Sequence, residues 1–185
     1  MGECVAAALL GALTWTLAEY LLHRFLGHDK RTWPNLFATE HTRHHSQGDY
    51  FAPSWKKVVA ALVVLAAITP LAWLAAGVRV GVTYSAAFVA MYLAYEVLHR
   101  RAHTHPGWGR YGRFVRRHHF FHHFGNTKLN HGVTSPLWDL LFATYAPSGH
   151  VRVPEKLAMV WLVDPQTAEV RREFSGVYEL VRSRG

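Results

Sequence analysis

Histidine is the residue whose number and spacing first indicate chemistry in this chain. It occurs 14 times in 185 residues. Ten of these histidines form four spaced groups: His23 and His28; His41, His44 and His45; His99 and His103; His119, His122 and His123. Side chains three or four positions apart share one face of a helix, and neutral imidazole is a common metal ligand. The pattern therefore predicts imidazoles that converge on bound metal.

The first pair is spaced differently from the others. His23 and His28 are five positions apart, which separates them by about 140° around an ideal helix. We therefore expect either an unwound helix end at this pair or two imidazoles that bind different metals.

The number of imidazoles indicates the number of metals. Ten nitrogens are too many for one ion, whereas five on each of two ions leave one position open on an octahedral metal; a structural zinc site closes with four ligands. An open pair of metals favours chemistry with an exogenous ligand such as dioxygen, and imidazole suits iron and zinc alike. The single cysteine, Cys4, excludes thiolate zinc sites, iron–sulfur clusters and internal disulfides. Because one histidine alone is more often an ordinary surface or core residue, the prediction depends on the four groups together.

The elements that must position these groups are apolar. Residues 4–22, 58–77 and 80–98 are almost free of charge, and each is close to the roughly 20 residues that cross about 30 Å of hydrocarbon as a helix. They predict three transmembrane helices, with buried helices of a soluble bundle as the alternative. Pro70 bends the second helix, which membrane helices tolerate. The first segment has no preceding Lys or Arg and no evident cleavage site, so we expect it to remain in the mature protein.

The basic residues predict the orientation. The net charge is +8, and Lys and Arg gather between the first two spans and after the third. Such residues collect on the cytoplasmic side of a membrane. We therefore expect an integral membrane protein with its histidines on the cytoplasmic face, in a bacterial inner membrane or, in a eukaryote, the endoplasmic reticulum. The charge then faces anionic lipid headgroups, and no motif predicts a nucleic-acid partner.

Three motifs together resemble a known superfamily. The histidine groups follow the order HxxxxH, HxxHH, HxxxH, HxxHH, and two further segments accompany them: "YEVLHRRAH" at residues 95–103 and "HGVTSPLWDLLFATY" at residues 131–145. This arrangement resembles the fatty acid hydroxylase and sterol desaturase superfamily, and within it the fatty acid 2-hydroxylases. The carotenoid hydroxylases are less similar, since their third box typically reads HDxxxH. The resemblance covers nearly all of residues 22–145.

The resemblance implies a function and its cofactors. The ten grouped histidines would be the ligands of two metal ions, with iron expected and zinc an alternative in purified protein. The chain would hydroxylate a lipid C–H bond, on a fatty acid or fatty acyl chain, with O2 as co-substrate. Some relatives carry a fused b-type cytochrome, for which this chain has no room, so a separate electron donor is expected, either a reductase with ferredoxin or a b-type cytochrome. His118 lies four before His122 and is the alternative to His119.

Further residues are candidates for supporting roles. Glu96 and Asp139 are expected to orient imidazoles through the nitrogen that does not bind metal, or to make ordinary helix-end hydrogen bonds. His131 would lie near the ligands or at the substrate mouth, with an ordinary surface histidine as the alternative. Aromatic and apolar residues would line a substrate passage or anchor the protein at the membrane interface: Phe114, Phe120, Phe121, Phe124, Leu137 and Trp138.

The predicted fold is an all-α integral membrane protein forming one domain over residues 1–185. It comprises the three spans, a histidine-rich cytoplasmic cap at 99–149 and a helical tail at 150–185, whereas members of the superfamily typically have four spans. Two alternatives remain for function. One is a sterol or carotenoid hydroxylase or desaturase of the same superfamily. The other is a non-catalytic membrane metal-binding protein, although transport sites usually lie near the membrane midplane.

Overall fold

The computed structural model describes residues 1–107 and 109–182, and these form two compact units. The first, here called the helical unit, contains Met1–Glu19 and Ala52–Glu96. The second, here called the histidine unit, contains Tyr20–Phe51 and Val97–Gly185. All of the predicted ligand histidines belong to the second unit, and each unit is described by itself.

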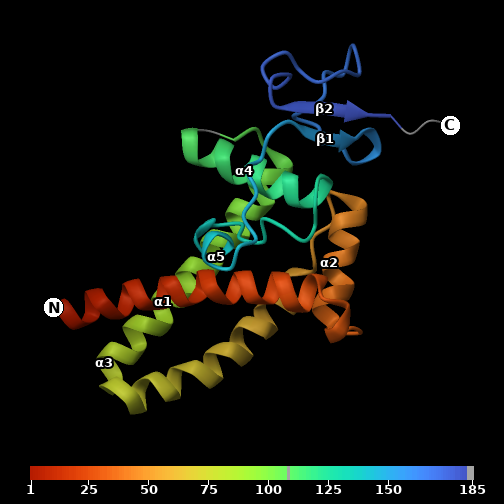
Figure 1. Ribbon diagram of the computed structural model, residues 1–185. Helices are drawn as coiled ribbons and strands as arrows, with labels where there is room; N and C mark the ends of the chain where they lie inside the picture. The colour runs from red at the N-terminus through yellow and green to blue at the C-terminus, as the bar shows by residue number, and fades with distance from the viewer. Residues whose placement is uncertain (108, 183–185) are drawn as a thin grey trace. The chain divides into compact units, whose positions relative to one another are not determined.

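Two long apolar helices supply the helical unit. They are α1 (Gly2–Leu21) and α3 (Ser54–Thr104). The chain of α3 turns back on itself (Figure 1), because Gly77 has φ 80° and ψ 161°, a conformation that favours glycine. Its two arms are joined by a 3.0 Å hydrogen bond from Thr69 to Ser85 and by a 2.5 Å ion pair between Lys57 and Glu96.

Helix therefore occupies each of the three predicted spans, with the second and third on the two arms of α3. By length and composition, the helical stretches Gly2–His28 and Ser54–Thr104 are long and apolar enough to cross a membrane. Their outward side chains are apolar and exposed, as at Leu9, Leu62 and Leu74.

Close packing holds α1 against α3. Trp15 lies edge-on to Phe88, with ring centroids 5.4 Å apart, and 4.8 Å from Tyr92. Gly11 lies so near the Tyr84 carbonyl oxygen that an added Cβ would lie 2.3 Å from it. The absence of a side chain at Gly11 allows this approach.

Short helices build the first part of the histidine unit. The chain leaves α1 through a π-helix, η1 (Leu22–His28), and a 3-10 turn, η2 (Lys30–Thr32). Helix α2 (Leu36–Gln47) begins at Asn35, whose side chain accepts a 2.7 Å hydrogen bond from the Ala38 amide. The end of α3 is followed by α4 (Gly109–Phe124) and α5 (Leu137–Leu141).

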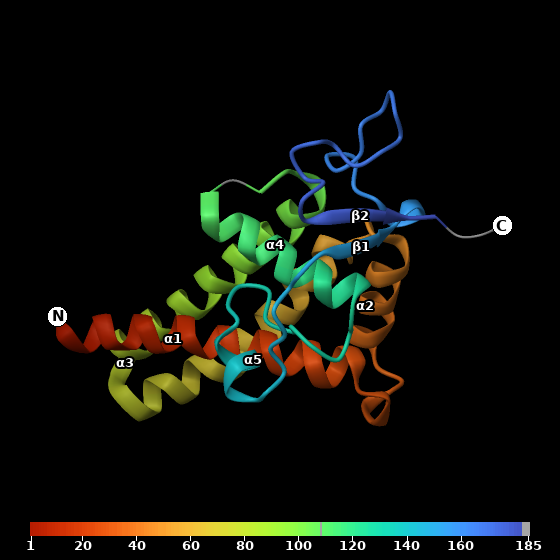
Figure 2. The ribbon, with the colours of Figure 1, turned by 45° about the horizontal axis from the view of Figure 1, so that its top comes forward.

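The C-terminal part corrects one prediction. Residues 150–182, here called the C-terminal lobe, were expected to be helical, but they contain β1 (Val151–Pro154), the 3-10 turn η3 (Glu155–Leu157) and β2 (Tyr178–Val181). The strands pair in parallel, with Val151 opposite Tyr178, so the described chain is not all-α. Val151 and Val153 are buried on one side of β1, which is the two-residue period of a strand. Both views show the strands beside α4 (Figures 1 and 2).

The lobe has a hydrophobic core shared with α4. The core includes Phe120, which belongs to α4 and is 0% exposed. The lobe itself contributes Val151, Val153, Met159, Trp161, Leu162 and Tyr178. This core attaches the lobe to the helix that carries the last histidine group.

Candidate metal centre

The ten predicted ligands come together as two groups of five. The first cluster is His23, His28, His41, His45 and His122, and the second cluster is His44, His99, His103, His119 and His123. Within each cluster, one ring nitrogen from every residue lies within 4.8 Å of the others. His118, the alternative to His119, is in neither cluster.

Two helices serve both clusters at once. In α2, His41 and His45 lie one turn apart and join the first cluster, whereas His44 is rotated by about 100° from His45 and joins the second. In α4, His122 joins the first cluster, and His119 and His123 join the second. The HxxHH spacing therefore places one helix between two centres.

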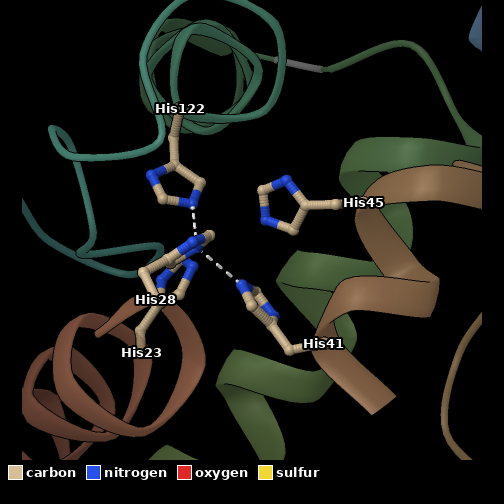
Figure 3. Close-up of side chains that lie close together, drawn as sticks. All are labelled: His23, His28, His41, His45 and His122. Atoms are coloured by element: carbon tan, nitrogen blue, oxygen red, sulfur yellow. Dashed lines mark hydrogen bonds between the residues drawn. The ribbon is translucent and has the colours of Figure 1, made fainter. Parts of the chain in front are cut away.

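A π-helix explains the unusual spacing of the first pair. Hydrogen bonds of the i→i+5 type widen the turn of η1, so His23 and His28, five positions apart, lie on the same side and enter the same cluster. The pair does not divide between the two clusters. Gly27 is needed beside them, because a Cβ there would lie 2.9 Å from the His41 ring. Figure 3 shows both imidazoles directed toward those of His41, His45 and His122.

Backbone carbonyls fix the tautomer of three cluster histidines. The Nδ1–H groups of His23, His44 and His122 donate to the carbonyl oxygens of His131, Tyr50 and Leu129, at 2.5, 2.7 and 2.7 Å. A carbonyl can only accept, so the hydrogen of each ring is on Nδ1 and the lone pair is on Nε2, which is directed into the cluster. This is the arrangement of metal-bound histidine with an oriented ring.

The remaining ring nitrogens also fit a cation. In the first cluster, Nε2 of His28 faces Nε2 of His41 and of His122, at 2.8 Å in both cases. In the described part of the chain, buried nitrogens without a hydrogen-bond partner include Nε2 of His23, Nε2 of His45 and both nitrogens of His123. Leaving such groups unpaired is costly, and a metal ion in each cluster would remove the cost.

Burial keeps these imidazoles neutral. Desolvation, followed by repulsion from neighbouring imidazoles, lowers the pKa of His41, His119, His122 and His123 well below the usual value of 6.5. The same causes lower the pKa of His45 to about 2. Protons therefore compete weakly with a metal ion for these nitrogens at neutral pH.

Asp139 supports the first cluster indirectly. Its carboxylate is 0% exposed and accepts 2.8 Å hydrogen bonds from the amides of His131 and Gly132 and from the Thr144 hydroxyl. It also accepts a longer bond, 3.3 Å, from Nε2 of His118. Burial alone would raise the pKa of Asp139, but the bonds from His118 and these groups outweigh it and hold the pKa below its usual value. Asp139 thus holds the backbone of His131, whose carbonyl orients His23.

Other predicted supporting residues lie elsewhere. Glu96 was expected either to orient an imidazole or to make an ordinary helix-end hydrogen bond, and in the structure its carboxylate pairs with Lys57. Phe120 was expected to line a passage, but it is fully buried in the lobe core. Both side chains contact partners that are distant in sequence.

The other aromatic candidates are partly exposed. Phe121 and Phe124 pack against the lobe core and border a surface hollow of about 410 Å³, together with His150 and Arg152. Trp138 is half-buried and stacks on Phe142 at 6.3 Å. Their role in binding a substrate remains a prediction.

The sequence model of the family described as "Fatty acid hydroxylase" matches residues 8–144. The chain belongs to the fatty acid hydroxylase family. The resemblance predicted from the histidine motifs is thereby confirmed. The matched region contains both histidine clusters and ends before the C-terminal lobe.

Individual members of the fatty acid hydroxylase family are also similar. The rat (Rattus norvegicus) fatty acid 2-hydroxylase is 34% identical over 152 residues, covering 75% of this chain and 39% of the relative. The dihydroceramide fatty acyl 2-hydroxylase of Arabidopsis thaliana is 31% identical over 142 residues, covering 72% and 58%. The chain thus spans about two fifths of the first relative and under two thirds of the second.

A solved structure has the same fold. It is described as full-length scs7p with only the hydroxylase domain visible, and its TM-score to this chain is 0.60. The sequences are 25% identical, and the match covers 80% of this chain and 59% of the other.

Sequence reasoning missed a hydrogen-bonded support behind Asp139. Arg24 donates to the Tyr20 hydroxyl at 2.6 Å, and that hydroxyl lies 2.9 Å from the Thr144 hydroxyl, which bonds to Asp139. Tyr20 is separated from Thr144 by 124 positions, so no local spacing could have paired them.

Proposed function

We propose that this chain is a membrane-bound di-metal oxygenase that hydroxylates a lipid C–H bond. The observation that carries the proposal is the pair of five-histidine clusters, in which six side chains are buried and four are partly buried. Five imidazoles leave one position of an octahedral ion for an exogenous ligand. Iron is the metal proposed for both clusters, and when bound the metal pair would supply activation of O2 with two external electrons, giving a hydroxylated lipid and water.

The chain's own residues hold and orient the imidazoles. Asp139 fixes the backbone of His131, and the His131 carbonyl fixes the ring of His23. Leu129 and Tyr50 do the same for His122 and His44 through their carbonyls. Burial of the clusters excludes bulk water and keeps the imidazoles neutral, so no proton has to be removed from them before a metal ion binds.

The proposed substrate is a fatty acid or fatty acyl chain. The relatives named fatty acid 2-hydroxylase and dihydroceramide fatty acyl 2-hydroxylase support this class and carbon 2 as the position oxidised. We further propose that residues 4–22, 58–77 and 80–98 span the membrane, with the clusters at its cytoplasmic face. A separate reductase with ferredoxin, or a b-type cytochrome, would supply the electrons.

Lipid profiling of expressing cells tests the proposal. Cells are grown aerobically with iron and a suitable reductase, and the control expresses His122→Ala, which removes a ligand whose ring is fully buried in the first cluster. We expect a lipid that gains one oxygen atom only with the unaltered protein, and fragmentation would place it at carbon 2. Identical lipids from both strains, with both proteins present in the membrane, would contradict the proposed activity.

A further inference from the structure

The C-terminal lobe contacts the end of α3 that carries two ligands of the second cluster. The indole Nε1–H of Trp161 donates a buried 3.0 Å hydrogen bond to the carbonyl oxygen of His103. His103 lies in the last turn of α3, where the final four carbonyls have no partner within the helix. Trp161, which is 58 positions away in the sequence, therefore supplies the missing hydrogen bond to one of these carbonyls.

A second side chain holds the same helix end. Arg116 of α4 is buried, and its Nη1 donates to the His105 carbonyl at 3.3 Å. The guanidinium carbon also lies 4.1 Å from the centroid of the Trp161 ring. A cation is favourable at a helix C-terminus, and the ring face adds cation–π attraction. Arg116 and Trp161 thus pack against each other, and each donates a hydrogen bond to a carbonyl at the end of α3.

Ring packing extends the contact to the imidazole itself. Trp161 stacks on Phe120 with centroids 6.2 Å apart, and Phe120 lies edge-on to the His103 ring at 5.1 Å. Phe120 is fully buried, so this stack has little freedom to shift. The lobe acts on both the backbone and the ring of His103, and β1 and β2 lie beside α4, which contributes Phe120 (Figure 2).

We propose that Trp161 is a positioning residue for the second metal. Its N–H fixes the end of α3, and through it the placement of His99 and His103, so retention of the metal in the second cluster depends on the lobe. The inference rests on the proposed function, since it requires that the cluster binds metal. The region matched by the family ends at residue 144, so it does not include this contact.

Metal release from the cobalt(II)-loaded full chain tests the role of Trp161. Cobalt(II) absorbs in the visible range, and a chelator removes it at a measurable rate from each site. Trp161→Phe keeps an aromatic ring but removes the N–H donor. Since loss of an outer partner of a ligand typically weakens metal binding by about 10- to 100-fold, we expect one of the two cobalt equivalents to leave about 10- to 100-fold faster and the other to leave at the unaltered rate.

Two further variants identify the cause and the site. Val153→Ala removes volume from the same lobe core but keeps the indole donor, so we expect neither release rate to rise by the roughly 10-fold or more expected for Trp161→Phe. In a His122→Ala background, which disrupts the first cluster, Trp161→Phe should still accelerate release of the remaining cobalt. Equal release rates with and without Trp161→Phe, or an equal acceleration by Val153→Ala, would overturn the positioning role. Failure of the unaltered chain to bind cobalt would overturn the metal centre as well.

Discussion

Replacing Asp139 by Asn tests how the first cluster is supported. The Asp139 carboxylate is fully buried, and its Oδ1 accepts from the His131 amide and the Thr144 hydroxyl. Its Oδ2 accepts from the Gly132 amide and from His118. An Asn side chain can retain the first pair, but its NH2 group would then face two donors. Asp139→Asn therefore removes two hydrogen bonds and one negative charge with almost no change of volume.

The magnitude follows from these bonds. Hydrogen bonds to charged groups contribute about 1.5–3 kcal/mol each. The bond from Gly132 is 2.8 Å long and that from His118 is 3.3 Å, so the lower part of the range applies and the loss is about 3–4 kcal/mol. For a chain of this size, that corresponds to a fall in Tm of about 6–16 °C.

Metal binding should change together with stability. The His131 carbonyl that orients His23 follows the backbone held by Asp139, so metal affinity at the first cluster should fall by about 10-fold or more. Thermal unfolding in detergent measures the first effect and metal titration the second. Asp164→Asn is the matched control, because Asp164 lies in a surface turn and bonds to the Gln166 amide; its Tm should fall by no more than about 4 °C.

A specific result would refute this reasoning. If Asp139→Asn unfolds at the same temperature as Asp164→Asn and binds two metals with unaltered affinity, the carboxylate does not support His23. A fall in stability with unaltered metal affinity would separate the two roles and leave Asp139 as a folding residue only.

Two other predictions concern pH and local space. Burial lowers the pKa of His45 to about 2 and that of His131 to about 4. In the unfolded chain both groups have a pKa of about 6.5, so the unfolded chain binds protons more tightly than the folded one. The free energy of unfolding of the metal-free protein should therefore fall as the pH falls below 6.5, by about 1.4 kcal/mol per pH unit for each histidine. Melting temperatures from pH 8 to 4 check this, and a flat profile would contradict it. Gly27→Ala should weaken metal binding at the first cluster, because the new Cβ would lie 2.9 Å from the His41 ring; metal titration against Gly149→Ala, where nothing lies within 4 Å, should reveal the difference, and equal affinities would show that the ring can move away.

Features that depend on local spacing could be predicted from the sequence. The three apolar segments are helical, and histidines four positions apart (His41 and His45, His99 and His103, His119 and His123) share a centre, since such side chains lie on one helix face. Histidines three positions apart were also expected to converge, but His44 and His122 each belong to the other cluster. The division of ten imidazoles into two sets of five also agrees with the expected coordination. Membership of each set could not be predicted, because it depends on how separate helices pack.

The misjudged parts involve distant partners or an unusual local geometry. The π-helix at Leu22–His28 has no pattern as regular as the 3.6-residue period. Short strands such as Val151–Pro154 gain their stability from β2 and from Phe120, which lie far away in sequence. The partner of Glu96 could not be identified from its neighbours in sequence, because its carboxylate pairs with the Lys57 ammonium on the opposite arm of α3.

The interleaving of the two clusters along α2 and α4 restricts how this centre can change during evolution. An insertion of one residue between His41 and His44 would rotate the later ligands by about 100°, and it would damage both metal sites in a single step. A one-residue insertion between His119 and His122 in α4 would have the same effect, because His122 belongs to the first cluster and His119 and His123 belong to the second. Substitution of one side chain can alter a single site, but any change in helix register alters both. The register of α2 and of α4 must therefore be kept for both clusters at the same time.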